Sequence, residues 1–176
     1  LNVNVPATSV DDIANLSYPN TNFCQGQALT LTPTVTGVQG GSFTAAPAGL
    51  TLSPTGVINV DGSSTNTYTI SYNTAGAPGS VCPVVVTFTL TINPSPVLAP
   101  IQTDACEGET IDLQTLTPST AGLTFSWFSG TPATGTNLGG NLIINASLTG
   151  PAYWLLATDA ATGCTEEIQL IINIVT

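Results

Sequence analysis

Apolar and polar residues alternate along much of the chain, in short stretches separated by turn residues. In Thr87–Ile92, for example, three threonines alternate with Phe88, Leu90 and Ile92. A period of two places one set of side chains on a solvated face and the other in a core, as in a half-buried β-strand. Helical periodicity is not convincing anywhere beyond a turn at Thr8–Ala14. The pattern therefore predicts an all-β fold.

Ten stretches predict strands, five in each half of the chain, and Gly, Pro, Asn and Asp clusters separate them. Threonines dominate the polar faces, because β-branched side chains favour extended backbone. The apolar face of the first half is expected to contribute Leu29, Leu31, Phe88, Leu90 and Ile92 to a core. The predicted strands are Ala28–Val35, Gly41–Ala45, Val57–Val60, Tyr68–Asn73 and Val84–Ile92, then Thr110–Leu116, Leu123–Phe128, Asn141–Asn145, Ala152–Ala157 and Glu167–Ile174.

The four cysteines reveal an internal repeat. Cys24 and Cys82 are 58 residues apart, as are Cys106 and Cys164, and the second pair is offset from the first by 82 residues. The sequence that begins at the first cysteine of each pair also repeats, Cys-Gln-Gly-Gln-Ala-Leu-Thr-Leu against Cys-Glu-Gly-Glu-Thr-Ile-Asp-Leu. Equal spacing, a shared motif and a fixed period indicate two copies of one domain.

Four cysteines allow three pairings, and the repeat favours Cys24–Cys82 and Cys106–Cys164. Closing such a loop would stabilise each domain by about 4 kcal/mol in the chain-entropy model. An even number of cysteines at repeated spacing points to an oxidising, extracellular compartment. The alternative is four free buried thiols in a cytosolic protein.

Aromatic residues are expected in both cores, Tyr68 and Phe88 in the first domain and Trp127 in the second. Trp127 is expected to pack near the Cys106–Cys164 bridge, as the strand-C tryptophan does in immunoglobulin folds. Tyr153 is also assigned to the core, but it alternates with Trp154, so either Tyr153 or Trp154 faces inward and not both.

The domain boundaries follow from composition. Residues 6–93 are predicted to form the first domain and 97–176 the second, with a stiff proline-rich linker over 94–100. Residues 1–5 resemble the last strands of the two domains. We expect them to be the tail of a preceding repeat, an exchanged strand or an ordinary first strand. The chain starts at Leu1 and contains no Met, so we expect a mature product or an excised segment.

Charge removes many functions from consideration. The chain has ten acidic residues and no Lys, Arg or His. An imidazole base, a catalytic triad, a Schiff-base lysine and a phosphate-binding lysine are therefore excluded. Nothing neutralises phosphate, so neither nucleic acid nor an anionic membrane is expected as a partner. The apolar runs are too short to span a membrane.

Carboxylates could still act as catalysts or bind Ca²⁺. Exposed neighbours such as Glu107 with Glu109 or Glu166 with Glu167 do not form the cleft that a glycosidase needs, and we expect no enzyme. Asp104, Glu107 and Glu109 are a candidate Ca²⁺ site at the domain junction, because Ca²⁺ requires several carboxylate oxygens. Ordinary solubilising charge is the alternative, and otherwise no cofactor is expected.

Two stretches of the sequence resemble a known family. The run Gly-Leu-Thr-Leu-Ser-Pro-Thr-Gly-Val-Ile-Asn-Val over 49–60, followed by Thr-Tyr-Thr-Ile over 67–70, resembles the immunoglobulin-type repeats of bacterial surface proteins. The Cys-x-Gly opening, Trp127 and the turn before Cys164 resemble repeats in giant Bacteroidota adhesins, including gliding-motility adhesins exported by type IX secretion. The resemblance implies two tandem immunoglobulin-like β-sandwiches, each with one intradomain disulfide.

Two functions follow as expectations. The first is a rigid, disulfide-stapled stalk within an extracellular, cell-surface adhesin or fibre. Its partners would be neighbouring repeats, or a surface polysaccharide or other cell-surface ligand. The alternative is a subunit of a non-covalent extracellular filament, in which Leu1–Val5 or Ile168–Val175 completes a neighbour's sheet by β-augmentation.

Overall fold

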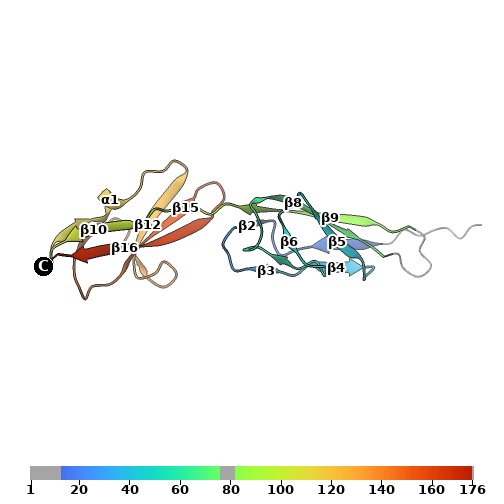
Figure 1. Ribbon diagram of the computed structural model, residues 1–176, viewed down its shortest axis with the longest axis horizontal. Helices are drawn as coiled ribbons and strands as arrows, with labels where there is room; N and C mark the ends of the chain where they lie inside the picture. The colour runs from blue at the N-terminus through green and yellow to red at the C-terminus, as the bar shows by residue number, and fades with distance from the viewer. Residues whose placement is uncertain (1–12, 76–81, 176) are drawn as a thin grey trace, which may run out of the picture. The chain divides into compact units, whose positions relative to one another are not determined.

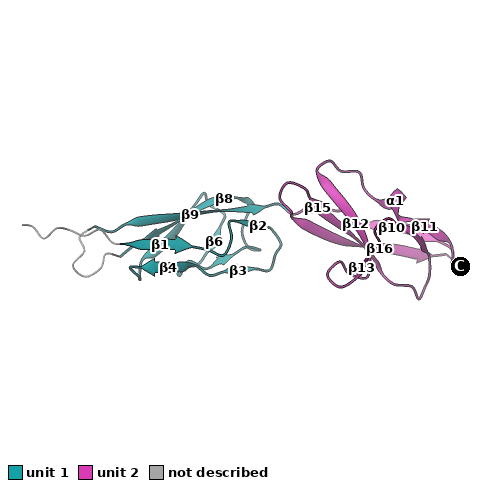
Figure 2. Cartoon of the chain, turned by 180° about the vertical axis from the view of Figure 1, so that it is seen from behind, with its two compact units in different colours: residues 1–94 teal, residues 95–176 magenta. Residues whose placement is uncertain are grey.

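The computed structural model describes residues 13–75 and 82–175. The chain divides into two compact units, unit 1 at residues 1–94 and unit 2 at residues 95–176 (Figure 2). The division falls between Pro94 and Ser95, inside the proline-rich segment. The predicted exchanged strand at 1–5 and most of the predicted helical turn lie outside the described residues.

Unit 1 is built from β-strands (Figure 1). One sheet has the strand order β2-β9-β8-β5, a second has the order β3-β7-β6, and β1 pairs with β4. The strands are β1 Ala14–Ser17, β2 Asn22–Cys24, β3 Thr30–Leu31, β4 Thr34–Gly37, β5 Ser42–Ala46, β6 Thr51–Leu52, β7 Ile58–Asn59, β8 Asn66–Asn73 and β9 Val85–Asn93.

Unit 2 repeats this plan. Its large sheet has the order β10-β16-β15-β12-β13, and β11 pairs with β14. The elements are β10 Ile101–Ala105, β11 Thr110–Asp112, α1 Leu113–Leu116, β12 Leu123–Ser129, β13 Thr136–Asn137, β14 Ile143–Asn145, β15 Tyr153–Asp159 and β16 Thr165–Ile174.

The large sheets of the two units are arranged alike around their last strand. In each, the first strand of the large sheet runs parallel to the last strand, β2 beside β9 and β10 beside β16. The last strand then pairs with the strand before it through a hairpin, β8–β9 or β15–β16. Residues of both sheets enclose one apolar core in each unit. Each unit is therefore an immunoglobulin-like β-sandwich, and the predicted all-β fold class is confirmed.

The core of unit 1 follows the period-two pattern of β8 and β9. Tyr68, Ile70 and Tyr72 are buried and alternate with the exposed Thr67 and Thr69 and the half-buried Ser71. The Tyr68 hydroxyl donates to the Ser64 carbonyl at 2.7 Å, and burial raises the pKa of this hydroxyl. Phe88 packs against the same core. Leu29, expected in this core, is instead 39% exposed, because β3 begins only at Thr30.

A second buried tyrosine, directly after β1, contacts the turn between β6 and β7. Tyr18 is buried, its ring centroid lies 5.3 Å from that of Phe88, and its hydroxyl donates to the Gly56 carbonyl at 2.6 Å. Burial raises the pKa of Tyr18 to about 12. Gly56 has a φ of +83°, and a β-carbon there would lie 2.6 Å from the Phe43 ring. The Pro-Thr-Gly turn of the sequence motif therefore requires glycine for both conformation and space.

The core of unit 2 surrounds Trp127, which is 3% exposed on β12. Its indole Nε1 donates to the Thr117 hydroxyl at 2.8 Å, as expected for a buried polar group. Tyr153 is half-buried and packs against this core on the same face of β15 as Leu155. A predicted strand over Thr110–Leu116 ends early, because the Asp112 side chain accepts from the Gln114 N–H at 2.9 Å and caps α1.

Several short strands were not predicted. They include β1 and β2, each of which contributes one buried residue to the core, Leu16 and Phe23. They also include β10, which directly follows the predicted linker. The predicted strand Ala28–Val35 is divided into β3 and β4 at Pro33, since proline has no N–H to donate to a sheet. Among the described residues, we find no helix with the length and apolarity to cross a membrane.

Replacing Thr117 with valine should selectively destabilise unit 2. The change leaves the buried indole N–H without an acceptor, which typically costs about 1–3 kcal/mol. Both tryptophans of the chain lie in unit 2, so urea unfolding followed by tryptophan fluorescence reports this unit alone. Thr117→Ser retains the hydroxyl and serves as the matched control. Equal stability of the two variants would contradict the assigned role of this hydrogen bond.

Candidate functional site

The four cysteines are the most distinctive chemical groups of the chain, and they exist in two states. Cys24 and Cys164 are disulfide-bonded. Cys82 and Cys106 are free thiols, and both are exposed. The predicted pairings Cys24–Cys82 and Cys106–Cys164 are therefore wrong, and neither unit contains an intradomain disulfide.

Strand geometry explains why the pairing inside unit 1 cannot form. Cys24 ends β2, where it pairs with Asn93 at the end of β9. Cys82 lies before Val85, where β9 begins. The nine residues of β9 span about 30 Å at roughly 3.3 Å per residue. A disulfide requires Cα atoms within about 7 Å.

Unit 2 repeats this arrangement. Cys106 directly follows Ala105, which pairs with Ile174 at the end of β16. Cys164 directly precedes Thr165, the first residue of the ten-residue β16. The two cysteines are again separated by the length of a strand, about 30 Å. Trp127 is buried as a core residue, but it has no Cys106–Cys164 bridge to pack against.

Cys24 and Cys106 occupy the same kind of turn. The Cys106 N–H donates to the Glu109 carboxylate at 2.8 Å, and Glu109 returns its own N–H to the Cys106 carbonyl at 3.0 Å. The Cys24 N–H likewise donates to the Gln27 side chain, at 3.4 Å. The intervening glycines, Gly26 and Gly108, have φ values of +83° and +82°. The repeated Cys-x-Gly-Gln/Glu motif therefore encodes the same type of turn in both units. We call the cysteine at the start of this turn, Cys24 or Cys106, the turn cysteine.

Cys82 and Cys164 occupy the second kind of position. Each lies in the hairpin that leads into the last strand of its unit, and we call it the hairpin cysteine. Cys164 lies in the turn between β15 and β16, where its carbonyl accepts from the Asp159 N–H at 2.8 Å. The Asp159 carboxylate accepts from the Ala161 and Thr162 N–H groups at 2.9 and 2.8 Å. Hydrogen bonds from Thr162 are the main reason that the pKa of Asp159 lies below its ordinary range.

The structure does not bring the predicted Ca²⁺ ligands together. Asp104 accepts from the Asn173 amide at 2.9 Å, Glu107 accepts from the Leu148 N–H at 2.9 Å, and Glu109 is engaged in the Cys106 turn. Over residues 13–75 and 82–175, no group of three His, Cys, Asp or Glu side chains could hold a metal ion. Each carboxylate instead orders a loop or strand end.

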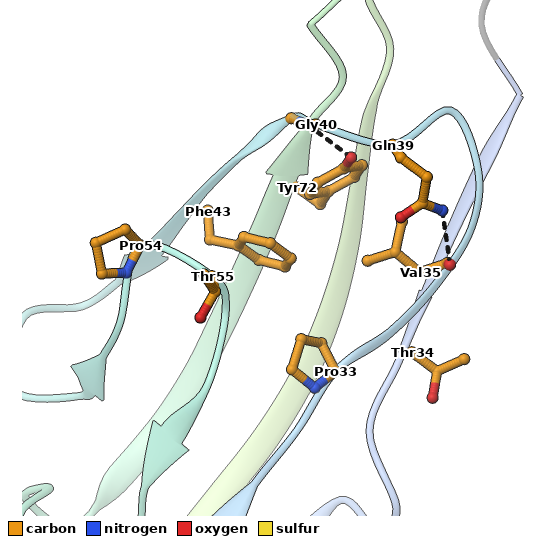
Figure 3. A pocket seen from close by; sticks show the side chains of 10 residues that line it. Pro33, Thr34, Val35, Gln39, Gly40, Phe43, Pro54, Thr55 and Tyr72 are labelled. Carbon is orange, nitrogen blue, oxygen red and sulfur yellow. Dashed lines mark hydrogen bonds between the residues drawn. The ribbon is translucent and has the colours of Figure 1, made fainter.

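A depression in unit 1, with a volume of about 550 Å³, was not predicted from the sequence (Figure 3). Phe43 and Tyr72 form one wall, with ring centroids 4.8 Å apart. The Tyr72 hydroxyl is already engaged, accepting from the Gly41 N–H at 2.8 Å and donating to the Val38 carbonyl at 3.0 Å. The lining contains no carboxylate and includes the uncharged polar residues Thr34, Gln39 and Thr55, so it offers aromatic and uncharged polar contacts rather than acid–base chemistry.

No protein-family model and no curated protein matches the chain. Solved structures with a similar arrangement include the N-terminal four Ig domains of Dscam1 isoform 6.9, at 9% identity and a TM-score of 0.33 over 93% of this chain and 52% of that chain. Extracellular domains 3–5 of Drosophila OTK align at 14% identity and a TM-score of 0.34, over 90% of this chain and 62% of that one. Titin domains z1z2, solved in complex with telethonin, align at 9% identity and a TM-score of 0.29, over 93% of this chain and 98% of that chain.

The chain spans about half of the Dscam1 fragment and about three-fifths of the OTK fragment. No conclusion about function follows from similarity at this level.

Unit 2 should lose stability in acid through Asp159. Because the folded state lowers the pKa of this carboxyl, its ionised form stabilises the fold above the ordinary aspartate pKa, and this contribution disappears as pH falls through the lower folded value. Urea unfolding of the native chain and of Asp159→Asn, followed by tryptophan fluorescence, should show a constant difference near neutral pH that shrinks below about pH 4. A difference that stays constant down to pH 2 would contradict this role.

Proposed function

We propose that the chain is a load-bearing, non-enzymatic segment of an extracellular, cell-surface fibre or adhesin. The observation that supports this most directly is the parallel pairing of the first and last strands of the large sheet in both units. Tension applied along the chain pulls these two strands in opposite directions. Their hydrogen bonds are then loaded together, in shear, rather than broken one after another.

The pairing is most extensive in unit 2. Five residue pairs join β10 to β16, from Ile101 with Leu170 to Ala105 with Ile174. The Val175 N–H adds a hydrogen bond to the Ala105 carbonyl at 2.9 Å. In unit 1, three pairs join β2 to β9, and the Thr91 and Gln25 N–H groups extend this contact at 2.7 and 2.9 Å. Both units can therefore resist extension through the same parallel pair of strands.

Cysteine chemistry supports the extracellular location. Disulfides persist in oxidising compartments and are rare in the cytosol, and Cys24 and Cys164 are disulfide-bonded. With the resemblance of the 49–60 run to bacterial surface repeats, this favours a stalk segment of a Bacteroidota adhesin exported by type IX secretion. Neighbouring repeats are its proposed partners, and the depression beside Phe43 and Tyr72 is where a surface polysaccharide could stack against aromatic rings.

The alternative, a filament built by strand exchange, has less support. β16 is already paired along its length within its own sheet, residues 165–169 with β15 and residues 170–174 with β10, so Ile168–Val175 is not an unpaired strand available for exchange. Leu1–Val5, the other proposed donor, lies outside the described residues. The mass of the reduced, denatured polypeptide from its source separates the two functions, because a long adhesin is many times heavier than 17.8 kDa.

Val175→Pro should weaken unit 2 under tension. Proline removes the N–H that donates to Ala105, and one hydrogen bond contributes about 0.5–1.5 kcal/mol. At constant force, unit 2 should therefore unfold roughly 2- to 10-fold faster. The measurement is single-molecule extension of the chain between handle proteins, with reductant present so that no disulfide bears the load.

The matched control is Val175→Ala, which keeps the N–H and changes only a side chain that is exposed in the structure. It should unfold at the native rate under the same force. If Val175→Pro and Val175→Ala behave alike, the parallel pair does not bear the load and the stalk proposal fails.

A further inference from the structure

The two free thiols occupy positions whose repeat equivalents are disulfide-bonded. Cys106 is the turn cysteine of unit 2, equivalent to the bonded Cys24 of unit 1. Cys82 is the hairpin cysteine of unit 1, equivalent to the bonded Cys164 of unit 2. One turn cysteine and one hairpin cysteine are thus bonded, and one of each kind is free and exposed. The repeat provides bonding positions, and two of the four are unused within this chain.

Within each unit, the two kinds of cysteine lie at opposite ends of the large sheet. The turn cysteine lies where the last strand ends, and the hairpin cysteine lies where that strand begins. In a fibre whose units follow one another in the same direction, the end of one unit that carries a turn cysteine would therefore meet the end of the next unit that carries a hairpin cysteine.

We propose that Cys82 and Cys106 form disulfides with other units of the same kind, Cys106 with a hairpin cysteine and Cys82 with a turn cysteine. In a second copy of this chain, these partners are Cys82 and Cys106 themselves, and the copies join head to tail. The inference rests on the proposed fibre function and names the covalent partner of this segment. Because the bond is heterologous, each copy keeps one free cysteine of the other kind, and the same bond can be repeated from copy to copy along a fibre.

The chemistry is an oxidation of two thiols. Formation of one S–S bond between Cys106 and Cys82 of another copy releases two protons and two electrons. A disulfide-bearing oxidant accepts them, its own S–S bond being reduced to two thiols through a mixed disulfide with one of the cysteines. Oxidised glutathione is the oxidant for the test below.

The decisive experiment mixes two single variants, Cys82→Ser and Cys106→Ser, each folded with Cys24 and Cys164 still bonded. Each is incubated with oxidised glutathione alone and in a 1:1 mixture, then analysed on non-reducing denaturing gels. The mixture should contain covalent dimers that neither variant forms alone, whereas the native chain should give a ladder of oligomers. The double variant Cys82→Ser/Cys106→Ser should remain monomeric.

Proteolysis on the N-terminal side of each aspartate identifies the bonded cysteines directly. Cleavage at the aspartates places each cysteine on its own fragment, at residues 12–60, 61–103, 104–111 and 159–176. The linked species from the native ladder should join fragment 61–103 to fragment 104–111. Trypsin could not provide this map, since the chain contains neither Lys nor Arg.

Three results would overturn the inference: no dimer in the mixture, equal dimerisation of each variant alone, or a Cys82–Cys106 bond confined to monomers. The outcome is separable from that of the proposed function. If cross-linking fails while Val175→Pro still accelerates unfolding under force, the load-bearing role stands and the covalent connection does not. If Val175→Pro has no effect while head-to-tail dimers form, the covalent connection stands and the load-bearing role does not.

Discussion

The parallel contact between the first and last strands of the large sheet organises each unit. In unit 2, this contact fixes β16 between β10 and β15, which buries Leu170 in the core around Trp127. In unit 1, β9 lies between β2 and β8, and Leu90 and Ile92 are buried in the same way. Because a strand of nine or ten residues separates the two ends of each unit, the same contact determines where every cysteine lies.

This placement changes the meaning of the repeat. Equal spacing of cysteines establishes that Cys24 matches Cys106 and that Cys82 matches Cys164, but it says nothing about which of them are close in space. Proximity depends on where the last strand of each unit begins and ends. Because one cysteine precedes that strand and the other lies beside its far end, the repeat places bonding groups at the ends of units rather than inside them.

How far the sequence predicts this molecule depends on the length and regularity of each signal. The strands β8, β9, β12, β15 and β16 alternate over seven or more residues, and all five were found from periodicity. β2 and β10 were missed, because three to five partly polar residues give no clear period. The carboxylates of Asp104, Glu107 and Glu109 are close in sequence, yet each is engaged by a different partner, Asn173, Leu148 or Cys106.

The absence of cationic side chains bears on how such units could associate. Within a unit, the polar contacts are hydrogen bonds between two uncharged groups or between a carboxylate and an uncharged donor. Examples are the Thr67–Thr91 hydroxyl pair at 2.9 Å and the Asp159 carboxylate with the Thr162 N–H. Between copies with a formal charge of −10 each, no side-chain ion pair can form and the net interaction is repulsive, although screened beyond about 8 Å at physiological ionic strength. A disulfide needs no charge complementarity, so a covalent end-to-end link is compatible with a surface that otherwise disfavours association.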